Sequence, residues 1–289
     1  MSKPDKCAHG GPTKANGNCT VPADDALAVQ CVGPWAEDKH DYLRRYIEAT
    51  KGPRSKFLKP SGNHPAGGAC FIDLFAGPGR SRVRTSGKII SGSPLISLEH
   101  TGAPFTKVVL AEKDAENVAA LSVRTDAHAG RVRIVPGDCN EKIEEILKEV
   151  PPHGLNIALI DPYGLRTLRF DTLQKLAALK RMDLVIHFPT MDIKRNFHQT
   201  SEFVTRFLGT DSWKQTVKKA EDAVKLVDIL KKQLGAFSYE QEKVRTLPIM
   251  QSKNVVIYHL VYATKDPLGN KIWQSIAKTT AQGQTGFRF

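Results

Sequence analysis

The sequence predicts an α/β protein built on a doubly wound, mostly parallel sheet, and two patterns carry this prediction. From about residue 69 to residue 188, apolar runs of strand length alternate with amphipathic stretches of helical length. Successive predicted strands also end in acids, and the strand ends of such a sheet converge on one crevice. These acids are Asp73, Glu112, Asp138 and Asp161.

Length and composition indicate a folded, basic protein. The 289 residues suffice for one large α/β domain, and the net charge of +12 favours a polyanion such as nucleic acid as a partner. No apolar run reaches the ~18 residues that span a bilayer. The N-terminus lacks the apolar segment of a secretory signal. The five cysteines form an odd set that suits a reducing compartment, so we expect a cytoplasmic protein with no membrane contact.

Residues 1–31 are rich in Gly, Pro, Asn and Ala and predict a flexible N-terminal tail, with the main domain over residues 32–289. Four side chains in this tail could bind zinc, but their spacing lacks the Cys-x-x-Cys pairs of structural zinc modules. We therefore expect free thiols and no metal, with a zinc site as the less favoured alternative. The four side chains are Cys7, His9, Cys19 and Cys31.

An amphipathic helix is predicted from Trp35, ending at Gly52-Pro53, with a basic linker after it. Lys39 is the one cation on the apolar face of this helix. Its stem could lie along the core with the ammonium group in water. Alternatively, the ammonium group could point into the cleft, at an anionic ligand group.

The stretch from Cys70 to Arg84 predicts a buried strand followed by a glycine turn. Glycines at a strand end let a ligand approach the backbone closely, and the acid before them can accept hydrogen bonds. A dinucleotide fold would carry Gly-x-Gly-x-x-Gly here. Arg82 stands at the position of the third glycine, which disfavours a nicotinamide oxidoreductase. A purely structural turn is the plainer alternative.

The segment Asp73-x-Phe75-x-Gly77-x-Gly79 resembles motif I of class I S-adenosylmethionine (SAM) methyltransferases. The resemblance implies that the acid faces the methionine amine of SAM and that the glycines make room for its carboxylate. We therefore predict SAM as the cofactor. The residues assigned to its binding are Asp73, Phe75, Gly77, Gly79, Glu112, Asp138 and Cys139.

Glu112 and Asp138 each also have an interpretation that involves no ligand. Glu112 could accept both ribose hydroxyls, or it could be a solvated acid at a helix N-terminus. Asp138 could accept from an adenine amino group while the backbone N–H of Cys139 donates to the ring. Equally, Asp138 could cap the helix that begins near Asn140.

The junction Asp161-Pro162-Tyr163 is the candidate catalytic site. Methyl transfer to an exocyclic amine needs an acceptor for the amine N–H and a flat surface for the base. Asp161 with the Pro162 carbonyl supplies the first, and Tyr163 can stack on a flipped base. The junction resembles those of adenine-N6 and transfer-RNA guanine-N2 methyltransferases, which leaves the base open. A strand-to-turn junction with no chemistry is the alternative.

Two basic segments are candidates for contact with the substrate. Arg80 and Arg82 lie in an acid-free run after the glycine turn, where contact with phosphates competes with ordinary solvation. Lys194 and Arg195 lie in the segment 191–240, which predicts a helical insert beside the cleft. Two strands after the insert predict an antiparallel hairpin that completes the sheet.

Taken together, the chain resembles the three-Cys-motif partner (TcmP) proteins from about Val32 through the terminal hairpin. The resemblance implies a Rossmann-like class I methyltransferase fold and a cytoplasmic bacterial protein. It also implies a partner, a three-cysteine, radical-SAM-like protein that binds an iron–sulfur cluster. The matching segments are residues 33–39, 73–79, 92–94, 161–164 and 183–184.

We therefore predict a SAM-dependent methyltransferase that acts on an exocyclic amine of a nucleic-acid base, adenine N6 or guanine N2. The alternative is a SAM-binding partner subunit of the three-cysteine protein that catalyses nothing itself.

Overall fold

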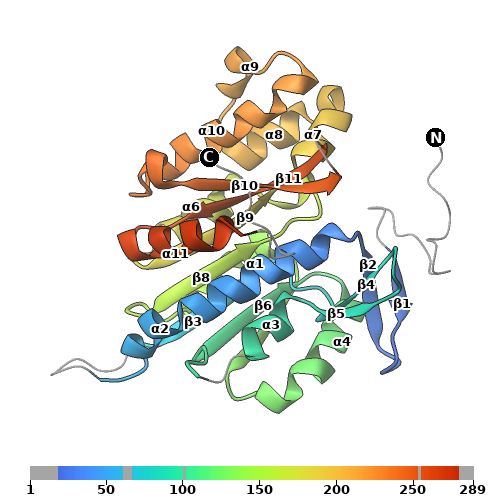
Figure 1. The fold of residues 1–289 in the computed structure, drawn as a ribbon, viewed down its shortest axis with the longest axis vertical. Coiled ribbons are helices and arrows are strands. Elements are labelled where there is room, and N and C mark those ends of the chain that lie inside the picture. Colours follow the sequence, from blue (N-terminus) through green and yellow to red (C-terminus); the bar gives the residue numbers. More distant parts are fainter. Residues whose placement is uncertain (1–18, 61–66, 100–101, 253–254, 280–289) are drawn as a thin grey trace.

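The computed structural model describes residues 19–60, 67–99, 102–252 and 255–279, and a seven-stranded sheet is its centre (Figure 1). Five neighbouring strands are parallel, and the terminal hairpin adds two antiparallel strands at one edge. This confirms the predicted doubly wound sheet with a C-terminal hairpin, the strand arrangement of class I methyltransferases. In spatial order the strands are β10 (Arg245–Ser252), β11 (Val255–Ala263), β9 (Met182–Phe188), β8 (Leu155–Ile160), β3 (Ala69–Asp73), β6 (Lys107–Glu112) and β7 (Val132–Pro136).

Helices cover both faces of the sheet because side chains of a central strand alternate between two cores. Phe71 packs into one core and Ile72, the next residue of β3, into the other. The first core is covered by α1 (Trp35–Ala49), α3 (Ser93–Glu99), α4 (Ala115–Thr125) and α11 (Pro267–Ala277), of which α1 and α11 cross in front of the sheet in Figure 1. The second is covered by α5 (Cys139–Lys148), α6 (Phe170–Ala177), α8 (Ser201–Leu208) and α10 (Lys225–Gly235).

The insert between β9 and β10 is helical, as expected. Besides α8 and α10 it contains α7 (Thr190–Arg195) and the short α9 (Trp213–Thr216). These helices gather at one end of the molecule (Figure 1), and α7 contacts β11. None of the helices in the described ranges is both long and apolar enough to span a bilayer.

A second sheet of four strands lies beside the glycine turn and corrects the predicted tail. Its order is β1 (Thr20–Pro22), β2 (Ala28–Val32), β4 (Arg80–Val83) and β5 (Ile89–Ser91). Residues 20–22 and 28–32 therefore form strands and are not part of a flexible tail, because β2 pairs with β1 and with β4 of the main domain. Cys31 N–H donates to the Cys19 carbonyl across β1 and β2 at 3.0 Å. Cys7 and His9 lie outside the described residues.

Two further expectations near the N-terminal half are wrong. Gly52-Pro53 does not end a helix but lies in the first turn of α2 (Lys51–Phe57). Proline is tolerated there because a first-turn N–H has no intrahelical acceptor. The chain breaks instead at Thr50, whose backbone leaves the helical region. The predicted basic linker is likewise helical over α2, and the basic run after Gly79 forms the hairpin of β4 and β5.

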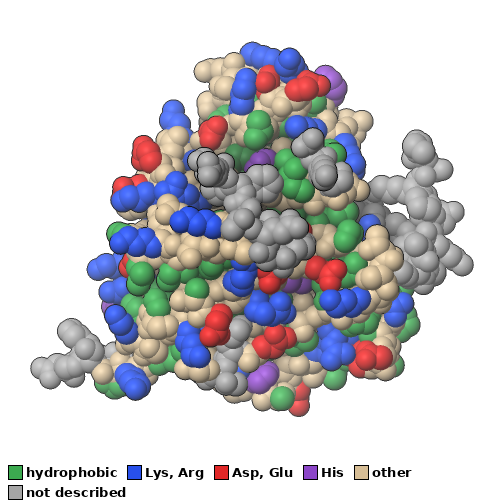
Figure 2. All heavy atoms as spheres, in the orientation of Figure 1, with side chains coloured by type: hydrophobic (Ala, Val, Ile, Leu, Met, Phe, Trp, Pro, Cys, Tyr) green, Lys and Arg blue, Asp and Glu red, His purple; other side chains and the backbone are tan. Residues whose placement is uncertain are grey.

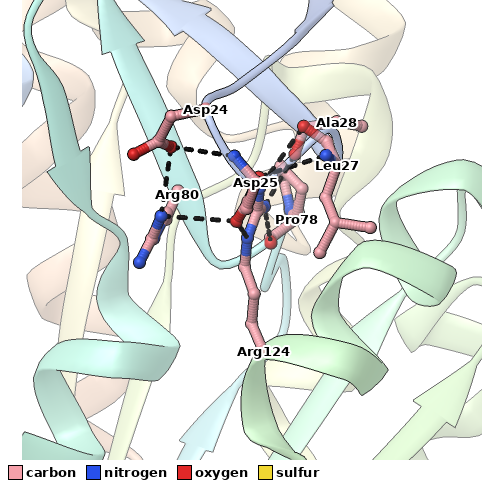
Figure 3. A network of polar contacts seen from close by, with 7 residues as sticks. All are labelled: Asp24, Asp25, Leu27, Ala28, Pro78, Arg80 and Arg124. Atoms are coloured by element: carbon pink, nitrogen blue, oxygen red, sulfur yellow. Dashed lines mark hydrogen bonds and ion pairs between the residues drawn. The ribbon is translucent and has the colours of Figure 1, made fainter.

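Arg124 of α4 fastens the small sheet to the glycine turn (Figure 3). Its guanidinium donates to the carbonyls of Pro78 at 2.6 Å and Ala28 at 2.7 Å, and it pairs with the Asp25 carboxylate at 2.8 Å. Only 4% of the Arg124 side chain is exposed. Arg80 reaches the same carboxylate at 3.3 Å. The small sheet has a core of only four fully buried side chains, so these polar contacts carry much of its attachment.

Candidate active site

Two adjoining cavities lie at the carboxyl edge of the parallel strands. The first, here called the β6–β7 cavity, has a volume of about 400 Å³ and contains Glu112 and Asp138. The second, the β8–β9 cavity, has a volume of about 470 Å³ and contains Asp161 and His187. The carboxyl edge of such a sheet is where ligands bind in this architecture.

The glycine turn forms part of the lining of the β8–β9 cavity. Gly77 and Gly79 have φ of +62° and +85°, a conformation that glycine adopts without strain, and both line the β8–β9 cavity. Asp73 itself is fully buried and lines neither cavity. Its Oδ1 accepts from Phe75 N–H at 3.0 Å, and the Ser93 side chain also donates to the carboxylate. Burial raises the pKa of Asp73 to about 7.

Glu112 joins the end of β6 to the glycine turn. One carboxylate oxygen accepts from Gly77 N–H and the other from Asp114 N–H, both at 2.7 Å. The residue is 4% exposed and lines the β6–β7 cavity, so it is not a solvated surface acid. Each oxygen keeps a free lone pair for a ligand hydroxyl.

Asp138 caps α5, as one of its two interpretations required, and it also lines the same cavity. Its Oδ1 accepts from Asn140 N–H at 3.0 Å, and Lys113 lies 3.2 Å from Oδ2. Burial disfavours its charge, but these donors outweigh burial and lower the pKa of Asp138. Cys139 follows as the first residue of α5, and burial raises the pKa of its thiol to about 12, which leaves it protonated.

A partition of three side chains separates the cavities, and all three line both of them: Gln30, Phe75 and Tyr163. The Tyr163 hydroxyl donates to Gln30 Oε1 at 3.1 Å. Its ring meets that of Phe75 edge to face, with centroids 6.5 Å apart. Tyr163 is 40% exposed, so its ring is available to a ligand. Gln30 comes from β2, in the segment first assigned to the tail.

A cluster of opposite charges forms the floor of the β8–β9 cavity. Asp161 follows β8, and its Oδ2 pairs with the Lys39 ammonium of α1. Its Oδ1 lies 2.6 Å from His187 Nδ1, near the end of β9. Burial opposes the charge of Asp161, but Lys39 and His187 outweigh burial and hold its pKa well below the usual range. Lys39 therefore points into the cleft, as one of its two interpretations required, but its partner is a protein carboxylate.

The structure divides the four proposed substrate residues. Arg80 and Arg195 line the β8–β9 cavity, and Arg84, which donates to the Cys31 carbonyl at 3.2 Å, does so as well. Arg82 and Lys194 line neither cavity. Figure 2 shows Lys and Arg side chains spread over one face and interspersed with acids, so the basic charge of that face is not gathered in one patch.

Several residues of the site had no place in the sequence-based assignment: Gln30, His187 and Tyr258. His187 could have been found, because it is the one polar side chain after Asp183 in an otherwise apolar strand and lies near its carboxyl end. Gln30 and Tyr258 carry no such signal, since β2 and β11 reach the cavities only through strand pairing.

Comparison with known proteins finds no matching family model and no matching curated protein. The resemblance to three-Cys-motif partner proteins therefore stays a prediction. Among solved structures, the methyltransferase domain of bacterial CtHen1-C has a TM-score of 0.40 at 14% identity, over 78% of this chain and 97% of that one. A putative caffeoyl-CoA O-methyltransferase from Staphylococcus aureus has a TM-score of 0.38 at 10% identity, over 75% of this chain and 82% of that one.

A geranyl diphosphate methyltransferase, solved with GPP and sinefungin, has a TM-score of 0.33 at 12% identity, over 76% of this chain and 78% of that one. With identities and scores this low, the fold is assigned from the strand order and not from these likenesses.

Proposed function

We infer that this protein is a SAM-dependent methyltransferase that acts on an exocyclic amine of a nucleic-acid base. The observation that carries the inference is the junction of the two cavities. An acid-lined cavity meets a charged cluster at the partition of Phe75 and Tyr163. One cavity suits a nucleoside and the other an acceptor, with room for the transferred group between them.

The β6–β7 cavity fits the adenosine part of SAM. Glu112 keeps lone pairs for ribose hydroxyls, and Asp138 and Cys139 line the end where the adenine would lie. Gly77 and Gly79 have no side chains, so the glycine turn leaves space for the methionine carboxylate next to the backbone. Both residues have a positive φ, which favours glycine over any residue with a side chain. Bound SAM supplies an electrophilic methyl group on a sulfonium centre.

Asp73 lines neither cavity, so its carboxylate would attract the methionine amine electrostatically across the glycine turn. Burial of its carboxylate outweighs the hydrogen bonds from Ser93 and Phe75, so a nearby ammonium would stabilise the carboxylate form. Burial holds the pKa of Asp73 near 7, so cation binding should be coupled to loss of its proton. Affinity should rise with pH through about 7 and then level off.

The β8–β9 cavity would hold the acceptor base. Asp161 and the Pro162 carbonyl can accept from amine N–H groups, and the exposed ring of Tyr163 can stack on the base. Lys39 pairs with Asp161 and Arg80 with Asp24 and Asp25, which leaves Arg84 and Arg195 as the cations of this lining that form no ion pair with an acid among the described residues. Such a lining favours a ligand that carries phosphates, which supports a nucleic acid as the partner.

The alternative, a SAM-binding partner subunit of a three-cysteine iron–sulfur protein, requires only the β6–β7 cavity and the glycine turn. The Lys39–Asp161–His187 cluster favours the enzyme, because a subunit without catalysis has no use for charges held at the cavity floor. The two proposals predict the same binding of S-adenosylhomocysteine but differ in methyl transfer.

The test is methyl transfer from SAM labelled in the methyl group to total RNA and to genomic DNA. We expect Asp161→Ala to lower the rate by about 10²-fold or more, because Lys39 and His187 lose their common partner. Asp171→Ala, an exposed acid at the start of α6, is the matched control and should keep the wild-type rate.

Measuring S-adenosylhomocysteine affinity in the same variants separates binding from chemistry. If Asp161→Ala transferred methyl groups at the wild-type rate, the role of Asp161 would be wrong. A wild type that binds S-adenosylhomocysteine but methylates neither nucleic acid would favour the partner subunit.

A further inference from the structure

The contacts of the His187 ring fix which of its two nitrogens carries the proton when the ring is neutral. Its Nδ1 lies 2.6 Å from Asp161 Oδ1, and Lys39 occupies the other oxygen of that carboxylate. An ionised carboxylate can only accept, so Nδ1 of His187 carries the proton and donates it. In the neutral imidazole the lone pair then lies on Nε2.

Packing fixes the direction of this ring. His187 is the next-to-last residue of β9, paired with Leu260 of β11, and its ring lies 4.1 Å from the Tyr258 ring. The side chain is 19% exposed and lines the β8–β9 cavity. Among the described residues no hydrogen bond engages Nε2, so the lone pair is available to a molecule in that cavity.

Methyl transfer to an amine needs a destination for one proton. The bond from the amine nitrogen to the methyl carbon forms while the carbon–sulfur bond breaks, and its electron pair stays on sulfur as a thioether. The nitrogen then carries a positive charge and must lose one N–H proton to become a neutral methylamine. A base within hydrogen-bond reach of the nitrogen speeds this loss.

We propose that His187 is this base, taking the N–H proton of the methylated amine on Nε2. This step rests on the proposed function. The imidazolium that forms is stabilised by Asp161, which keeps its charge, and the proton passes from Nε2 to water. Asp161 acts here as a positioning residue through His187, in the arrangement of a carboxylate–imidazole pair.

No other titratable group at the cavity floor fits the task as well. Lys39 is a cation paired with Asp161, and Asp161 resists protonation because its two partners hold its pKa low. Tyr258 carries its proton, since burial raises the pKa of its hydroxyl well above the usual value. His40 also lines the cavity, but burial lowers its pKa to about 3, which makes it a weak base, and Asp73 is fully buried and lines neither cavity. The charged and titratable side chains that line the cavity together with His187 are Cys31, Lys39, His40, Arg80, Arg84, Asp161, Tyr163, Arg195 and Tyr258.

The experiment measures methyl transfer to total RNA and genomic DNA across pH for the wild type, His187→Gln and His187→Ala. We expect both variants to lose about 10²- to 10⁴-fold in rate, with S-adenosylhomocysteine affinity kept within about threefold. The fall in wild-type rate at acid pH, where a protonated imidazole cannot accept, should disappear in His187→Gln. Added imidazole should restore part of the rate of His187→Ala.

His259→Gln is the matched control, a histidine on the neighbouring strand whose Nδ1 lies 2.7 Å from Thr190 Oγ1 and which does not line the cavity. It should keep the wild-type rate and pH profile. The proposal fails if His187→Ala keeps its rate, or if a slow His187 variant shows the wild-type profile and no response to imidazole. If the wild type transferred no methyl group, the proposed function would be wrong, and the proposed role of His187 would fall with it.

Discussion

The two cavities are built from the chain in different ways. The acids of the β6–β7 cavity, Glu112 and Asp138, come from consecutive strands, and each lies within two residues of its strand end. The floor of the β8–β9 cavity joins Lys39 and Asp161, which are 122 residues apart in sequence. A pocket made of strand ends follows from the sheet alone, whereas the charged floor also requires α1 to pack correctly against it.

Asp73 should affect stability and binding in opposite directions, and this is the largest effect we expect. Its pKa rises from 3.8 to about 7 on folding, so the folded state binds the proton more tightly. Stability therefore falls as pH rises from about 4 to about 7, by up to about 4 kcal/mol. Asp73→Asn should remove this fall and raise the free energy of unfolding at pH 8, measured by urea denaturation.

The same variant should bind S-adenosylhomocysteine more weakly and lose the rise of affinity through pH 7, measured by calorimetry. A variant that is less stable at pH 8, or one that binds with an unchanged pH profile, would show that Asp73 only supports the turn.

Replacing Arg124 tests the attachment of β2, which carries Gln30 of the partition, to the glycine turn. Arg124→Met should lower the free energy of unfolding by about 2 kcal/mol, because buried carbonyls and the Asp25 carboxylate lose a donor. S-adenosylhomocysteine affinity should fall too, since the contact holds β2 to the glycine turn. Arg133→Met removes a half-exposed arginine and should leave both quantities unchanged. If Arg124→Met kept the wild-type stability and S-adenosylhomocysteine affinity, the attachment of the small sheet would not depend on Arg124.

Alanine variants of Gly79 and Gly87 compare a strained backbone at the cavity with a strained backbone away from it. Each has a positive φ, +85° and +72°, so alanine should cost about 1–2 kcal/mol of stability at either position. Gly79 lines the cavity, and a methyl group added there would meet Leu121 at 3.3 Å and Arg124 at 3.5 Å and displace the turn, whereas one at Gly87 would meet nothing within 4 Å. Only Gly79→Ala should weaken S-adenosylhomocysteine binding, by roughly tenfold. Equal losses of affinity in both variants would mean that strain alone is responsible.

The sequence predicted the sheet and the β6–β7 cavity because both depend on local patterns. Asp138 follows its strand and precedes an amphipathic helix, so its place at the strand end is readable without the fold. The β8–β9 cavity was predicted only at Asp161-Pro162-Tyr163. His187 lies opposite Asp161 through strand pairing, and Gln30 arrives on a strand that composition alone assigns to a tail. Such contacts depend on strand order, which periodicity does not encode.

The long separation between Lys39 and Asp161 has a consequence for biosynthesis. At 5–20 residues per second, a ribosome needs roughly 6–25 s to add the 122 residues between them. During that interval the Lys39 ammonium has no Asp161 to pair with. Helix α1 also packs against α11, so its packing is complete only after Ala277 has been synthesised. The nascent chain can therefore complete the β6–β7 strand ends well before the charged floor, and the acceptor side lacks its paired charges during that interval.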